Sequence, residues 1–97
     1  MSYSLHPGAE QDLAGALGFY QEHAGRVVAA RLLDEFERVA QLLLTHPGLG
    51  TPTTQGRSAF PLQVFPYCIV YRPLDDGILI LIVRHQHRKP SLTTGRR

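Results

Sequence analysis

The stretch that decides the fold is FPYCIVYRPLDDGILILIVRHQHRKP, residues 65–90. Its two apolar runs, residues 68–71 and 78–83, are rich in the β-branched and aromatic residues that favour strands. Between them the tripeptide DDG at 75–77 supplies the polar residues and the backbone freedom of a tight turn. The stretch therefore predicts a β-hairpin. Because both strands are apolar at successive positions, we expect each to be covered on both faces.

Two helices are predicted ahead of the hairpin. The first covers about residues 7–23 and begins with a proline, which fits the first turn of a helix because its missing N–H has no partner there. The second covers about residues 26–44, and its apolar residues recur every three or four positions. We expect the polar positions of this second helix, Glu35 among them, to face solvent.

The remaining segments complete an α+β plan. A short strand is expected at residues 3–5, and an extended segment at 58–65 follows a loop, 45–57, that is rich in glycine and proline. The order β-α-α-β-β-β predicts a two-helix hairpin packed on one face of a mainly antiparallel sheet. We expect the opposite face to be an apolar groove, rimmed by arginine, that is open to a partner.

Length and composition indicate a single cytoplasmic domain. The 97 residues suffice for one core, and we expect the domain to cover residues 1–90, with 91–97 as a basic flexible tail. The longest apolar run, 78–83, is far shorter than the roughly 20 residues that span a bilayer, and the N-terminus lacks a signal-peptide pattern. We therefore expect no membrane association. The lone Cys68 reads as a small buried hydrophobe.

The charge of the chain is unevenly distributed. Residues 1–56 contain three arginines and six acidic residues, a balance of −3, whereas residues 57–97 contain seven basic and two acidic residues, a balance of +5. No acidic residue follows Asp76. This asymmetry favours an anionic partner, either nucleic acid or an acidic protein segment.

The basic end of the chain contains the candidate chemistry. His85 and His87 form an HxH pair, but no third ligand follows at a diagnostic spacing, so we predict no metal site and no cofactor. Arginine binds phosphate and histidine transfers protons near neutral pH, and RNA cleavage requires both functions. If the protein is a nuclease, the candidate catalytic residues are Arg57, His85, His87 and Arg88. The alternative is that these side chains only bind an acidic protein or cap the end of the sheet.

The sequence resembles the RelE/ParE superfamily of toxins from bacterial type II toxin–antitoxin systems. The resemblance covers nearly the whole chain and rests on four segments in order: HPGAEQDLAGALGFY, LLTHPGLGTPT, GRSAFPLQVFPYCIVYR and ILIVRHQHRKP. It implies the β-α-α-β-β-β fold and neutralisation by a cognate antitoxin. On that basis the antitoxin is expected to bind the uncovered sheet face, and the expected contact residues are Tyr67, Ile69, Tyr71, Ile80 and Ile82.

Members of this superfamily divide between two activities. RelE-like members cut messenger RNA on the ribosome, and here Cys68 stands where an arginine is typical, while no tyrosine follows Tyr71. FPYCIVYR and VRHQHRKP look more like ParE and the plasmid-stabilisation proteins. The resemblance therefore implies a ParE-like toxin that binds DNA gyrase; the alternatives are a ribosome-dependent mRNA endonuclease and a degenerate, non-toxic antitoxin-binding member. The expected target- or anion-binding residues are Arg57, Arg84, Arg88, Lys89, Arg96 and Arg97.

Overall fold

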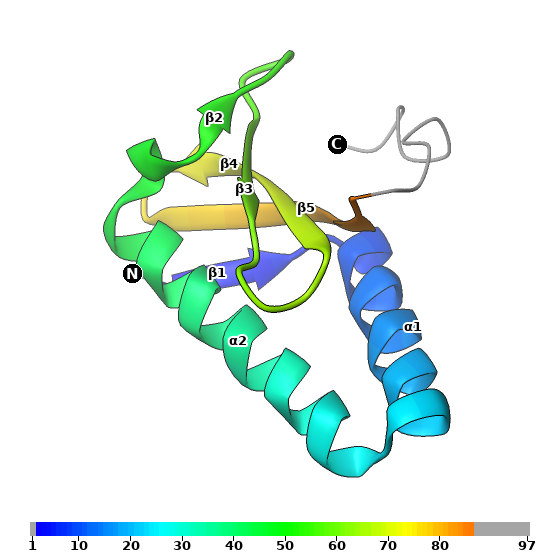
Figure 1. Ribbon diagram of the computed structural model, residues 1–97. Helices are drawn as coiled ribbons and strands as arrows, with labels where there is room; N and C mark the ends of the chain where they lie inside the picture. Colours follow the sequence, from blue (N-terminus) through cyan, green and yellow to red (C-terminus); the bar gives the residue numbers. More distant parts are fainter. Residues whose placement is uncertain (1, 87–97) are drawn as a thin grey trace.

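The computed structural model describes residues 2–86 (Figure 1). Two helices cover one face of a five-stranded sheet, which confirms the expected α+β class. The elements are β1 (Ser2–Leu5), α1 (Pro7–Ala24), α2 (Arg26–Thr45), the 3₁₀ helix η1 (Pro47–Leu49), β2 (Thr51–Pro52), β3 (Ser58–Pro61), β4 (Tyr67–Leu74) and β5 (Gly77–His85).

The strands lie in the order β1-β5-β4-β3-β2. β1 runs parallel to β5, and the three other pairings are antiparallel, so the sheet is mixed but mainly antiparallel. Two details differ from the sequence-based expectation. The loop after α2 contains the short strand β2, and the extended segment at 58–65 is a strand only as far as Pro61. Proline has no N–H to donate to a ladder, which explains why β3 ends there.

The helix boundaries follow from local capping. The Nδ1 atom of His6 accepts a hydrogen bond from the Gly8 N–H at 3.0 Å, at the start of α1. The His6 N–H donates to the Ile80 carbonyl at 2.8 Å, so the same residue ties the helix start to β5. Gly25, with a φ of 92°, separates the two helices in a conformation that only glycine adopts easily.

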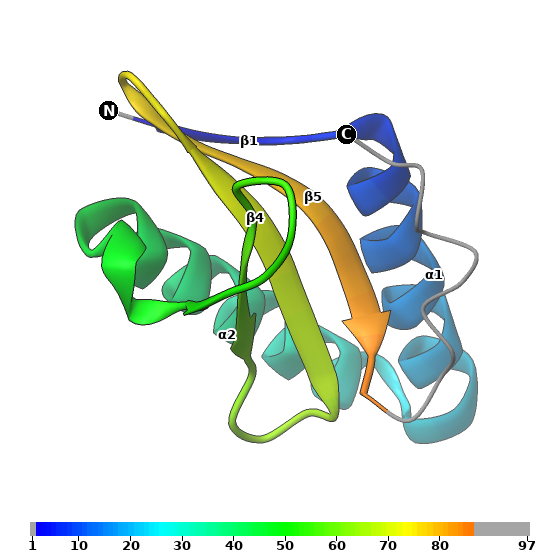
Figure 2. The ribbon, with the colours of Figure 1, turned by 90° about the horizontal axis from the view of Figure 1, so that it is seen from above.

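The main core lies between the helices and the sheet. Apolar residues of α2 pack on alternate residues of β4 and β5, and the side chains of Phe36, Ile69, Ile78 and Ile80 are almost completely buried. Burial of such a cluster from water is the main source of stability for a domain of this size. In Figure 2, seen from above, β4 and β5 cross the molecule between α2 on one side and α1 on the other.

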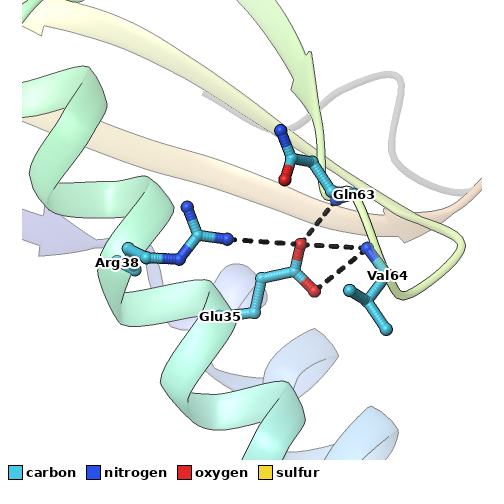
Figure 3. A network of polar contacts seen from close by, with 4 residues as sticks. All are labelled: Glu35, Arg38, Gln63 and Val64. Carbon is cyan, nitrogen blue, oxygen red and sulfur yellow. Dashed lines mark hydrogen bonds and ion pairs between the residues drawn. The ribbon is translucent and has the colours of Figure 1, made fainter.

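Glu35 differs from the expectation that the polar side of α2 faces solvent. Its side chain is buried, and its carboxylate accepts hydrogen bonds from the backbone N–H groups of Gln63 and Val64, the latter at 3.1 Å (Figure 3). Arg38, one turn along α2, lies 3.7 Å from the same carboxylate. Glu35 therefore joins α2 to the loop between β3 and β4 through those two backbone N–H groups.

A second polar link fixes the chain after α2. The hydroxyl of the buried Tyr71 donates to the Pro47 carbonyl at 2.6 Å and accepts from the Gly50 N–H at 3.0 Å. A Cβ atom at position 50 would collide with this hydroxyl. Glycine at this position is therefore required by the close approach of β4, and η1 is held against the sheet.

Candidate functional site

The expected antitoxin-binding residues do not lie on the face where we expected them. Tyr67, Ile69, Tyr71 and Ile80 belong to the main core, and at most 7% of any of them is exposed. Residues at alternate positions of a strand point to the same face, and here that face is the one covered by the helices. The expectation that these four side chains form an open surface is therefore corrected: their burial within the chain leaves a partner little to contact.

The opposite, outer face of the sheet is also less open than expected. Val70, Leu81 and Ile82 form a second cluster there, with exposed fractions of 4%, 0% and 3%, and Ala59 and Leu79 pack against it. The hydrophobic patch that we expected as an open groove is thus closed within the chain. Of the five expected contact residues only Ile82 points to this face.

The basic candidates at the end of β5 point in opposite directions. Arg84 pairs with Cys68 in the ladder, and His85 pairs with Tyr67. The ring of His85 contacts the ring of Tyr67, with 5.2 Å between centroids, on the side of the main core. Arg84 is two residues after Ile82 in β5, so its side chain points to the same face of the sheet as the outer cluster. Two neighbouring residues that the sequence suggested as partners are therefore separated by the sheet itself.

Arg57 lies apart from both. Arg57 is the residue before Ser58, and Ser58 pairs with Tyr71 of β4. The backbone of Arg57 is therefore level with residue 72 of β4, whereas Arg84 pairs with Cys68 at the other end of that strand. Four strand residues separate the two points, a distance of about 13 Å at the usual rise per residue. Arg57, Arg84 and His85 are therefore not brought to one point. The other candidates, His87, Arg88, Lys89, Arg96 and Arg97, lie outside the described residues.

Cys68 is a half-buried thiol on the outer face. Burial raises the pKa of the Cys68 thiol above its ordinary value, while the Arg84 guanidinium and a hydrogen bond with the Phe60 backbone act in the opposite direction. The net effect is a thiol that stays protonated near neutral pH. Cys68 thus has the low reactivity of a structural cysteine.

Residues 2–86 contain no group of three or more His, Cys, Asp or Glu side chains arranged to hold a metal ion. In the same range, none of the helices combines the length and the apolar character needed to cross a bilayer.

Exposed apolar side chains are found elsewhere on the surface. They are distributed over the helices, the loop between β3 and β4, and the end of β4. Val64, at 79%, and Val27, at 68%, are the most exposed, and Val64 is in the loop that Glu35 holds. The sequence does not distinguish these residues, because several of them stand directly beside residues that are buried in the core. The full set is Phe19, Val27, Leu42, Leu49, Val64 and Leu74.

Comparison with known proteins identifies the family. The family model described as "ParE toxin of type II toxin-antitoxin system, parDE" matches residues 3–90. The curated protein "Toxin ParE2" of Mycobacterium tuberculosis, found in the strains CDC 1551 / Oshkosh and ATCC 25618 / H37Rv, is 31% identical over 88 residues. That alignment covers 90% of this chain and 83% of the relative.

The fold is shared with a solved structure as well. A chain of the "Chromosomal ParDE TA system from P. aeruginosa" superposes with a TM-score of 0.75 at 20% sequence identity. The match covers 88% of this chain and 95% of that one. The element order, the two-helix layer and the match of the family model over nearly the whole chain agree: this protein belongs to the ParE toxin family of type II toxin–antitoxin systems.

Proposed function

We propose that this protein acts in the cytoplasm as a ParE-like toxin that inhibits replication by binding DNA gyrase, and that a cognate antitoxin neutralises it. The observation that supports binding over catalysis is the separation of Arg84 and His85 by the sheet. Cleavage of RNA through the 2′-hydroxyl needs a base, an acid and a positive clamp around one phosphate. Arg57, Arg84 and His85 are not arranged around a single point.

The distribution of exposed apolar residues supports a role in protein binding. Val64 is held on a loop whose backbone is anchored by the buried Glu35, so a partner that covers Val64 meets a preformed surface. Phe19 on α1 and Val27 on α2 add exposed apolar area on the helical hairpin. Aromatic residues are enriched in protein interfaces, and exposed aliphatic side chains add apolar area that a partner can bury.

The target is tested by pulse labelling after induction of the chain in growing cells. Inhibition of gyrase predicts that DNA synthesis falls first, while translation continues. With purified components, the chain should inhibit supercoiling by gyrase in proportion to its concentration. An immediate arrest of translation accompanied by cleaved messages would instead support the endonuclease alternative.

Two variants separate the alternatives further. A nuclease that uses the end of β5 predicts that the double variant Arg84→Gln, His85→Gln loses message cleavage, whereas Arg31→Gln, on the exposed side of α2, retains it. Under the gyrase proposal neither variant produces message cleavage. Absence of any growth effect of the wild-type chain would point to the degenerate, non-toxic alternative.

The antitoxin is sought in the neighbouring gene. We expect a small protein with a DNA-binding N-terminal part and an acidic C-terminal part that co-purifies with this chain and restores growth. Val64→Asp should weaken the complex, because it places a charge on an exposed apolar contact without disturbing the core. Thr45→Asp, on an exposed residue at the end of α2, provides the matched control.

A further inference from the structure

The strand β1 forms an open edge of the sheet. It pairs on one side with β5, and the strand order places no described strand on its other side. The N–H groups of Ser2 and His6 both donate to carbonyl oxygens on the β5 side, at 3.3 and 2.8 Å. Because the backbone groups of successive strand residues point to opposite sides, those of Tyr3 and Leu5 point away from β5.

The outward backbone groups of Tyr3 and Leu5 have no hydrogen-bond partner among residues 2–86. Soluble proteins normally protect such an edge with a lysine, a proline, a bulge or a covering segment. The four residues of β1, SYSL, include neither a charged residue nor a proline, and Ser2 and Ser4 are exposed. The edge is therefore able to accept a further strand.

We propose that β1 pairs antiparallel with β1 of a second copy of this chain, about a two-fold axis at Ser4, so that two sheets join into one. In this register Tyr3 lies opposite the partner's Leu5, and the two residues exchange their outward N–H and C=O groups. The axis repeats the same exchange between Leu5 and the partner's Tyr3. The outward groups of both residues are then all hydrogen-bonded.

The side chains of β1 suit this pairing on both faces of the sheet. Tyr3 and Leu5 are half-buried against the main core, and the Tyr3 ring lies 6.5 Å from the Phe36 ring, between centroids. An aromatic residue opposite an aliphatic one is a favourable cross-strand pair, and it covers apolar area that a single copy leaves exposed. On the outer face, Ser4 meets the partner's Ser4 across the axis. Because β1 brings no charge to this point, two copies approach there without repulsion.

The opposite edge of the sheet favours a closed dimer over an extended array. β2, Thr51–Pro52, is only two residues long and ends in a proline, which has no N–H to donate. A head-to-tail contact of β1 with β2 would leave a free edge on each side and would grow into a fibre. The contact of β1 with β1 uses the same surface on both copies, so neither copy keeps an open β1 edge. The uncharged edge also offers no charge complement to a strongly acidic or basic segment of another protein.

Self-association is measured on the purified chain by sedimentation equilibrium at low ionic strength, together with amide hydrogen exchange. We expect a monomer–dimer equilibrium, and exchange at the Tyr3 and Leu5 N–H groups that slows as the protein concentration rises. Ser4→Glu should weaken the dimer about fivefold, because it places two like charges directly opposite each other at the axis. Ser4→Lys should weaken it for the same reason. An equimolar mixture of these two variants should restore the dimer, since opposite charges then meet.

The control is Thr54→Glu, which adds the same charge on an exposed residue between β2 and β3. Equal weakening by Thr54→Glu would show a mere effect of net charge and would overturn the proposal. A wild-type chain that stays monomeric at millimolar concentration, oligomers that grow beyond the dimer, or a mixture of the two Ser4 variants that stays dissociated would also overturn it. If Ser4→Glu fails to fold, the concentration dependence of exchange at Tyr3 and Leu5 carries the test. The gyrase proposal is unaffected by any of these results, because only the purified chain is measured.

Discussion

At the scale of single residues, Glu35 stabilises the fold in a way that the surrounding sequence does not reveal. Glu35→Ala removes the carboxylate that accepts from the Gln63 and Val64 N–H groups and so releases the loop from α2. We expect a loss of about 1.5–3 kcal/mol in the free energy of unfolding, the range for hydrogen bonds to a charged group. Urea denaturation measures the loss, and amide hydrogen exchange should accelerate at Gln63 and Val64. Glu37→Ala, on the exposed side of α2, should change stability by less than about 0.5 kcal/mol. Equal stability of the two variants would contradict the role of Glu35.

A second single residue, Cys68, makes the stability of the fold depend on pH. Burial raises the pKa of the Cys68 thiol, and Arg84 lowers it in part. Because the folded pKa lies above the unfolded value, the contribution of this thiol to stability is full below the unfolded pKa and is lost as the pH rises through the folded pKa. The rate of alkylation by iodoacetamide should follow the thiolate and remain low at neutral pH. Arg84→Gln should move the alkylation profile to higher pH, and a shift to lower pH would contradict the assigned neighbour.

At the scale of elements, the parallel pairing of β1 with β5 depends on Gly77. Gly77 pairs with Ser2, and a Cβ at position 77 would overlap the Ser2 backbone carbonyl. Gly77→Ala should therefore displace β1 and lower the melting temperature by several degrees. Gly15→Ala, in α1, is the matched control because nothing lies within 4 Å of its Cβ. Alanine is the better helix former by roughly 1 kcal/mol, so the control should be stabilised. A stabilised Gly77→Ala would refute the proposed close approach.

At the scale of the whole molecule, one core joins both helices to the sheet. Ile80 is completely buried in that core, and its carbonyl accepts the hydrogen bond from His6. Ile80→Asp places an unpaired charge in an apolar interior, so we expect global unfolding in place of a local defect. Thermal denaturation followed by circular dichroism should show no cooperative transition for this variant. Ile80→Val should fold and cost about 0.5–1.5 kcal/mol. A folded Ile80→Asp chain would show that β5 is not central.

The sequence by itself determined the class of fold, the helix boundaries within one or two residues, and the two central strands. These features depend on local signals: apolar residues at helical spacing in α2, Gly25 between the helices, and DDG in the turn of the hairpin. Local signals predict elements well because each element must bury its own apolar residues. They do not identify the neighbour against which each face is buried.

Only the tertiary structure decided which side chains are available to a partner. Tyr67, Ile69 and Tyr71 share one face of the sheet, but that face is the one the helices cover. Residues as far apart in the chain as Glu35 and Val64 become partners through packing, and no local pattern encodes the pairing. Function in this chain therefore rests on contacts that the sequence specifies only through the complete fold.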